Sequence, residues 1–282
     1  CMSCRFEILD AATSRQDVYF RFIRSAVNGT LFHQPRFLSY HDPEALRRRG
    51  IEARCVALYK GGSLIGLVPG GAQGEEDEEA FLSPYGSAYG GIVFRRGLSL
   101  ENLRRMVQAF QDFLHREGFR RARIMLPLPC FYREPLYDSM EFLLFEEGYS
   151  VTDVDLKMVV DLRRGSVDEQ FHHSARKFLR QARERGVRVR PSGDRSGFFR
   201  RAAAYYRSRG VRVTHAPEEM DRLFALFPDD FFLFEAVREK DLLGGLLLVR
   251  VNDDSLYAMY VHLEEQAYRL RAVNALYAHI LH

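Results

Sequence analysis

Apolar residues recur every three or four positions in several stretches of the chain, which predicts amphipathic helices. The clearest stretch begins after Ser99, a residue type suited to cap a helix, and ends at Gly118. Its apolar positions share one helical face: Leu103, Met106, Val107, Phe110 and Leu114. Further helices are expected at residues 14–27, 31–40, 135–147, 198–207, 217–227 and 272–282.

Other stretches alternate apolar and polar residues, the period of a β-strand. Two hairpins are expected, one from 55–59 to 63–68 and one from 232–237 to 242–251. Single strands are expected at 123–126, 151–162 and 255–262, with a loop at 70–79. Residues 81–94 are expected to be strand broken by Pro84 and several glycines, which permits either a close approach of a ligand or a bulged, bent strand pair. Helices mixed with antiparallel hairpins indicate an α/β fold (α+β, with mixed sheets).

The second half of the chain repeats the first, because each half runs helix, helix, hairpin, strand, helix. We therefore expect a first domain at 1–162, and at 163–282 a connecting basic helix with a second domain. The second repeat stops inside its last helix, so we expect that unit to be truncated, with roughly 35 to 50 further residues in the native protein.

A single basic helix is predicted at 166–186, between the two halves. Ser166 and Glu169 form a capping pair, and Gly186 can end the helix. One helical face is apolar: Phe171, Ala175, Phe178, Leu179 and Ala182. The other face is basic and could hold an anion: Arg176, Lys177, Arg180 and Arg183. The alternative is a solvated charged face with no ligand.

Composition and charge argue against several classes of protein. The 282 residues carry a formal net charge of only +3, so the arginine clusters are weak evidence for nucleic-acid binding. Four scattered cysteines do not suggest a disulfide framework, and we expect no metal site. No apolar run reaches the length of a membrane span and no signal segment opens the sequence, so we expect a cytoplasmic protein.

Candidate site residues lie on two predicted strands. Tyr260 and His262 are two positions apart, so they share one face, where they could transfer protons or contact substrate. The alternative is aromatic packing in the core. Tyr89 lies in the glycine-rich stretch 81–94, where a ligand could approach the backbone closely. Nucleophile-elbow and Walker motifs are absent from the sequence.

Four short motifs occur in a characteristic order along the two repeats. They are Phe32-His33-Gln34-Pro35, Tyr89-Gly90-Gly91, Ser174-Ala175-Arg176-Lys177 through Gly186, and Tyr268-Arg269 with Asn274. In this order the chain resembles the FemAB-like and CelD-like branch of the GNAT acyltransferase superfamily, over nearly its whole length. The family often has Trp where Phe37 stands, and this chain has no Trp.

The resemblance implies an N-acyltransferase or aminoacyltransferase that acts on an amine of a cell-envelope or polysaccharide precursor. It implies acyl-CoA or aminoacyl-tRNA as co-substrate, with no tightly bound cofactor. An anionic substrate such as a nucleotide sugar, or a tRNA, would bind at Arg176, Lys177 and Arg180.

The loop that cradles coenzyme A in this superfamily is poorly matched. In the second repeat, residues 263–271 contain Glu264 and Glu265 and no glycine, so they would oppose a pyrophosphate. In the first repeat, residues 95–97 are more hospitable to anions but incomplete. The competing hypothesis is therefore a non-catalytic binding or scaffold protein on the same fold. The oligomeric state stays open.

Overall fold

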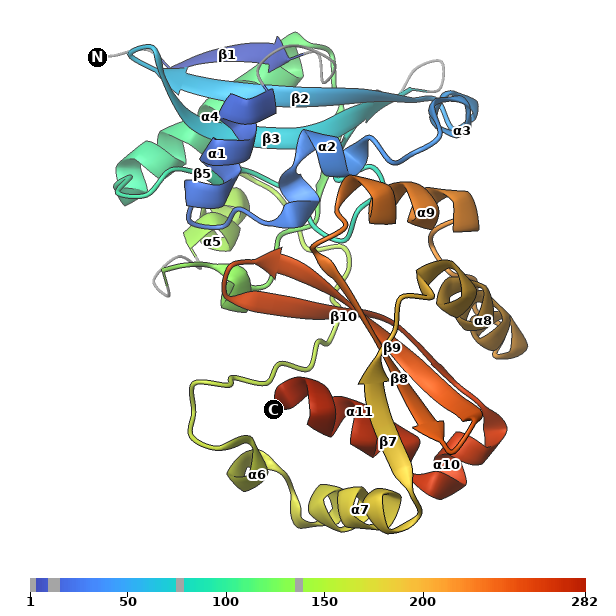
Figure 1. The fold of residues 1–282 in the computed structure, drawn as a ribbon. Coiled ribbons are helices and arrows are strands. Elements are labelled where there is room, and N and C mark those ends of the chain that lie inside the picture. The colour runs from blue at the N-terminus through green and yellow to red at the C-terminus, as the bar shows by residue number, and fades with distance from the viewer. Residues whose placement is uncertain (1–3, 10–15, 75–78, 135–138) are drawn as a thin grey trace. The chain divides into compact units, whose positions relative to one another are not determined.

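The structure is a computed structural model, and it describes residues 4–9, 16–74, 79–134 and 139–282. The chain folds into two units, each with its own sheet (Figure 1). The first unit comprises residues 1–156 with 251–255, and the second comprises 157–250 with 256–282. The division along the chain falls a few residues before the expected boundary, and one short segment of the second half belongs to the first unit.

The first unit forms one mixed sheet in the order β1-β2-β3-β4-β6, with β5 paired to β3. β4 and β6 pair in parallel, and the other pairs are antiparallel. Its strands are β1 (Cys4–Leu9), β2 (Ile51–Lys60), β3 (Ser63–Gln73), β4 (Ala80–Ser83), β5 (Val93–Phe94) and β6 (Arg121–Ile124). Its helices are α1 (Gln16–Ser25), η1 (Leu31–His33), α2 (Pro35–Leu38), α3 (Pro43–Arg48), α4 (Leu100–Arg116), η2 (Pro129–Phe131) and α5 (Ser139–Glu146).

Helices cover both faces of this sheet. Because side chains alternate along a strand, Val56 and Leu58 of β2 pack in the core that contains α4, while Cys55 and Ala57 pack against α1. The predicted apolar face of α4 is buried, and Ser99 Oγ accepts a hydrogen bond from the backbone N–H of Asn102 at 3.3 Å. The helix predicted from residues 99 to 118 is confirmed.

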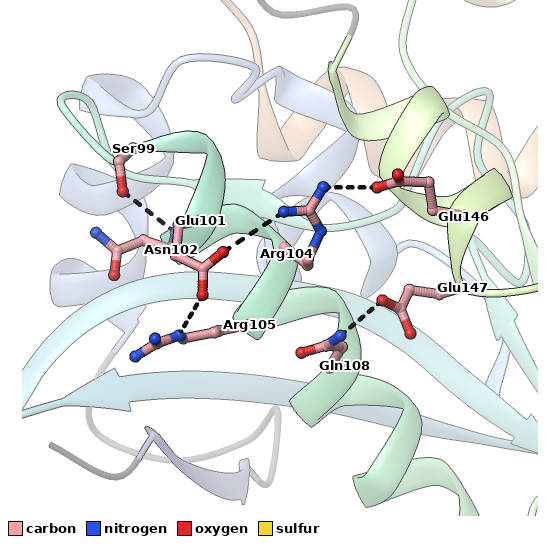
Figure 2. Close-up of polar contacts among 8 residues, drawn as sticks. All are labelled: Ser99, Glu101, Asn102, Arg104, Arg105, Gln108, Glu146 and Glu147. Atoms are coloured by element: carbon pink, nitrogen blue, oxygen red, sulfur yellow. Dashed lines mark hydrogen bonds and ion pairs between the residues drawn. The ribbon is translucent and has the colours of Figure 1, made fainter. Parts of the chain in front are cut away.

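The helices α4 and α5 are joined by an apolar contact and a polar border. Met140, Leu143 and Leu144 of α5 are buried in the same core as α4. Above them, Arg104 pairs with Glu146 at 2.8 Å and Gln108 donates to Glu147 at 2.8 Å (Figure 2). The expected start of α5, residues 135–138, lies outside the described residues.

The end of α1 is fixed to β5 by Asn28, which is fully buried. Its Nδ2 donates to the carbonyl of Ile92 at 2.8 Å, and its Oδ1 accepts from the N–H of Phe94 at 3.1 Å. The next residue, Gly29, packs so tightly that a Cβ there would lie 1.8 Å from the carbonyl oxygen of Ile23. Only glycine fits this turn.

The second unit forms a four-stranded sheet in the order β10-β9-β8-β7. Its strands are β7 (Val187–Pro191), β8 (Phe231–Arg238), β9 (Asp241–Asn252) and β10 (Ser255–Leu263). Its helices are α6 (Val167–Gln170), α7 (His173–Glu184), α8 (Arg195–Ser208), α9 (Pro217–Leu226), α10 (Glu265–Leu270) and α11 (Ala272–Leu281). The order strand, helices, three strands, helix is that of the first unit apart from the additional short strand β5 before α4, so the predicted tandem of mixed α/β units is confirmed.

Different helices cover the two faces of the second sheet. Ala182 of α7 and Leu276 of α11 are buried in one core with Ala236 and Leu246 of the sheet. Val261 of β10 is partly buried against that same core. On the other face, α8 places the Phe198 ring 5.1 Å from the His262 ring and the Phe199 ring 5.3 Å from the Tyr260 ring.

The prediction of a strand at 151–162 was wrong. These residues, which we call the linking segment, join neither sheet. Their apolar side chains are exposed, Leu156 and Met158 by 92% each. Alternation predicted the strand, but a strand also needs a neighbour to pair with.

Two further predictions need correction. The single helix at 166–186 is two helices, because Phe171 adopts an extended conformation and α7 starts anew after His172. The loop expected at 70–79 does not begin at residue 70, since β3 continues to Gln73, and residues 75–78 lie outside the described residues. Ser166 still caps the first piece, accepting from the N–H of Glu169 at 3.3 Å, and Gly186 ends the second with φ +77°.

Candidate functional site

The predicted basic residues lie on the exposed side of α7. We call Arg176, Lys177, Arg180 and Arg183 the basic surface; all four are solvent-accessible, while Leu179 and Ala182 on the opposite side are buried. Arg180 approaches Glu184 at 3.9 Å, and both side chains are mostly exposed. So loose a pair neutralises little charge. The surface therefore presents several cations to solvent.

Tyr260 and His262 share one face of β10, as expected, and this is the face covered by α8. The basic surface belongs to α7, which packs on the opposite face of the same sheet. The structure therefore does not bring the predicted catalytic residues together with Arg176, Lys177 and Arg180.

Tyr260 forms a buried hydrogen bond with His215, at 2.7 Å between the tyrosine oxygen and Nδ1. Burial raises the pKa of Tyr260 to about 12, although hydrogen bonds from Thr214 and His215 oppose the shift. The hydroxyl is therefore protonated at neutral pH, and it donates to Nδ1 in the His215 tautomer that carries its proton on Nε2. A tyrosine with a histidine behind it can accept a proton on oxygen while passing its own to the imidazole.

His215 was missed by sequence analysis. It lies between α8 and α9, in a stretch with no recognisable motif, and only the fold brings it to Tyr260, 45 residues later. No local signal in the sequence could have identified it.

His262 lies in a less reactive environment. It is 1% exposed, and burial, with a smaller effect of the Arg201 charge, lowers its pKa to about 4. Neither ring nitrogen has a hydrogen-bond partner among the described residues. A neutral imidazole with so low a pKa is a weak base at pH 7.

A buried carboxylate lies on this face too. Glu235 of β8 is 5% exposed and pairs with Arg201 of α8 at 3.0 Å. Arg201 also contacts Asp194 at 3.2 Å, and Arg190 approaches Glu235 at 3.7 Å. Breaking such a pair would leave a buried charge, so this network fixes α8 over the sheet.

In the first unit, Tyr89 is 4% exposed, and its ring packs near those of Phe32 and Phe131 at 5.7 and 5.6 Å. Aromatic pairs at such distances stabilise a core. This burial gives Tyr89 a packing role, and a ligand could reach the ring only after rearrangement.

His33 ties two of the sequence motifs together. Its Nδ1 accepts a hydrogen bond from the N–H of Thr30 at 3.1 Å, so Nε2 carries the proton and donates to the carbonyl of Gly90 at 3.0 Å. A Cβ on Gly90 would lie within 2.7 Å of the Ser83 and Pro84 backbone, so only glycine fits. The hydrogen bond and the close packing at Gly90 therefore hold the two motifs together, which is a structural role.

A small hollow lies beside Pro35, the last residue of the first motif. Its lining residues are Pro35, Leu38, Ala53, Arg54, Cys55, Pro69, Gly70 and Tyr85. Burial raises the pKa of the Cys55 thiol to about 12. Burial, and to a lesser extent Cys55, raises the pKa of Tyr85 as well. Both groups are therefore neutral at pH 7 and unsuited to nucleophilic attack.

The helix ends that could hold a pyrophosphate carry acidic residues. In the first unit, Glu101 lies in the first turn of α4, and Arg96 is paired with Glu134 at 2.8 Å. In the second unit, Glu264 is the N-cap of α10 and Glu265 opens it. Carboxylates already occupy the favourable end of each helix dipole, so neither end matches the usual coenzyme A cradle.

Neither a metal cluster nor a membrane-spanning helix occurs in the part of the chain that the structure describes. Those residues contain no group of three or more His, Cys, Asp or Glu side chains placed to hold a metal ion. Among the helices of the described ranges, none combines the length and apolar character that a membrane span needs.

The sequence matches no family model and no curated protein. Several solved structures share the architecture, among them the following three. A crystal structure of FemX matches with a TM-score of 0.68 at 12% identity, over 98% of this chain and 85% of FemX. The C-terminal domain of an Agrobacterium fabrum protein named as a putative lysylphosphatidylglycerol synthetase matches with a TM-score of 0.55 at 10% identity, over 95% and 73%. A tandem GNAT protein from the clavulanic acid biosynthesis pathway matches with a TM-score of 0.52 at 12% identity, over 99% and 86%.

Proposed function

We propose, from the FemX-like tandem GNAT fold of this chain, that it is a transferase of acyl or aminoacyl groups. The proposed acceptor is an amine of a cell-envelope or polysaccharide precursor. FemX and the protein named as a lysylphosphatidylglycerol synthetase support this choice at the level of fold. The proposed co-substrate is acyl-CoA or aminoacyl-tRNA. It would give up its acyl or aminoacyl group and then leave the protein, so it is not a tightly bound cofactor.

The observation that carries the proposal is the hydrogen bond between Tyr260 and His215. In acyl transfer the amine nitrogen bonds to the acyl carbon, the bond from that carbon to the donor breaks, and the amine must lose a proton. We assign that proton to the Tyr260 oxygen, while the Tyr260 proton passes to His215 Nδ1. Tyr260 is 8% exposed, so the amine would reach it, as a ligand would reach Tyr89, only after rearrangement. The imidazolium then returns a proton to the leaving group or to solvent.

The test is a Tyr260→Phe variant, assayed with acetyl-CoA and aminoacyl-tRNA as donors and uridine-diphosphate amino sugars as acceptors. Loss of the relay should lower kcat about 10²- to 10⁴-fold with little change in KM. Tyr257→Phe is the matched control, because Tyr257 lies on the same strand and its side chain faces the other way. Full turnover by Tyr260→Phe would contradict the assignment.

The second candidate is a non-catalytic binding protein, favoured by the acidic residues at the starts of α4 and α10. It predicts no turnover with any donor and acceptor pair, but a higher melting temperature when one of these compounds is added. That pair of results would replace the transferase proposal.

A further inference from the structure

The linking segment has the alternating sequence pattern of a strand, but it is not part of either sheet. Its even-numbered positions are nearly all apolar: Thr152, Val154, Leu156, Met158, Val160 and Leu162. Its odd-numbered positions are mostly charged: Val151, Asp153, Asp155, Lys157, Val159 and Asp161. The side chain of Val154 is 85% exposed, and those of Leu156 and Met158 are 92% exposed. An exposed, alternating strip of this kind is suited to join the edge of a sheet.

β7 offers such an edge, because it is the last strand of the second sheet and pairs only with β8 among the described strands. Val187 is buried and Val189 partly buried, both in the core beneath α7 and α11. The alternating residues Arg188 and Arg190 are exposed on the other face. Arg190 also approaches Glu235 at 3.7 Å, whereas Arg188 has no ion pair among the described residues.

The linking segment and β7 have complementary residues on both faces of the strand that would form. A strand added beside β7 would set Val154 next to Val189 on the apolar face. In an antiparallel pairing, Asp155 would then lie beside Arg188 and Asp153 beside Arg190, both on the polar face. Opposite charges across neighbouring strands stabilise the pairing, and like charges destabilise it.

We propose that residues 151–162 of one copy add as a strand to the free edge of β7 in a second copy. The occupant is a second copy because each copy carries both the acidic strand and the basic edge, so a reciprocal exchange closes a two-fold dimer. Within the described part of a single chain, the linking segment joins no sheet and the outer edge of β7 has no neighbouring strand. This inference does not depend on the proposed transferase activity.

The test is sedimentation velocity of the full chain across the micromolar range, with charge-reversed variants. The wild type should dimerise reversibly. Asp155→Arg or Arg188→Asp alone should weaken the dimer about tenfold, because each reciprocal pairing exchanges an attraction for a repulsion. The mixture of the two variants should form a heterodimer, and the double variant should regain self-association. Asp112→Arg, an exposed site on α4, is the matched control and should dimerise like the wild type.

Hydrogen exchange supplies the second measurement. The backbone amides of residues 153–157 should be protected in the wild-type dimer and exchange freely in Asp155→Arg. A wild type that stays monomeric overturns the proposal. So does dimerisation that neither reversal weakens, or protection that is independent of concentration, since the last result means pairing within one copy.

Discussion

His33 is held in one tautomer and without charge. Burial lowers its pKa from the ordinary value of 6.5 to about 4, against the smaller raising effect of its bond to Gly90. The unfolded chain therefore takes up a proton at a higher pH than the folded chain does. Stability from His33 is complete above pH 6.5 and is lost as the pH falls through about 4.

We predict that the unfolding free energy falls by on the order of 3 kcal/mol over this window because of His33. His33→Gln should be less stable at pH 7 but should show a shallower pH dependence, as measured by urea denaturation from pH 7 to 4. His115→Gln, at an exposed position of α4, should keep the wild-type slope. An unchanged slope in His33→Gln would show that other groups cause the acid sensitivity.

At the scale of an element, the contact between α4 and α5 allows buried apolar packing to be compared with a partly exposed ion pair. Leu143 is fully buried, so Leu143→Ala should cost about 2–5 kcal/mol of stability, because apolar packing is removed and a cavity stays behind. The side chains of Arg104 and Glu146 are each about a third exposed, so Arg104→Ala should shift the melting temperature only slightly. Thermal denaturation of both variants checks this. Equal effects would mean that the polar border in Figure 2 contributes more than solvent screening allows.

The basic surface of α7 gives a second prediction at this scale. Lys177→Ala with Arg180→Ala should weaken binding of a uridine-diphosphate sugar or of tRNA by about 1–3 kcal/mol for each charge-assisted hydrogen bond removed. The melting temperature should not change, because exposed charges stabilise little. Titration calorimetry measures the affinity, and Lys240→Ala, an exposed lysine of the same unit, is the control.

If the double variant binds these compounds as tightly as the wild type, the alternative hypothesis is favoured, in which the basic surface of α7 is solvated and binds no ligand. Tyr260→Phe should leave the same affinity intact, because Tyr260 lies on the other face of the sheet. A parallel decrease in both variants would contradict this separation.

For the whole molecule, the order of elements could be predicted from sequence, because it depends on local signals. Helical spacing after Ser99 and the glycine turn at Gly61 and Gly62 specify α4 and the hairpin β2–β3 within a few residues. The repeat of that order in the second half then predicts two similar sheets.

Relations between distant segments could not be predicted in this way. The alternation of 151–162 shows what that segment could form with a neighbour, not whether an edge lies beside it. The hydrogen bond of His215 with Tyr260, and the placement of the basic surface on the other side of the sheet, arise from packing of α8 and α7 on opposite faces. A single sequence carries no local record of which face a helix will cover.

The clamped side chain of Asn28 also bears on how the protein ages. It precedes Gly29, and in a flexible Asn-Gly pair the following backbone nitrogen readily attacks the side-chain amide carbon, releasing ammonia and leaving aspartate or isoaspartate after hydrolysis. In the folded unit that amide is buried and held at both ends, by Ile92 and Phe94. Attack requires both bonds to open, so the fold itself preserves the residue, and chemical damage at this site records the time that a molecule has spent unfolded.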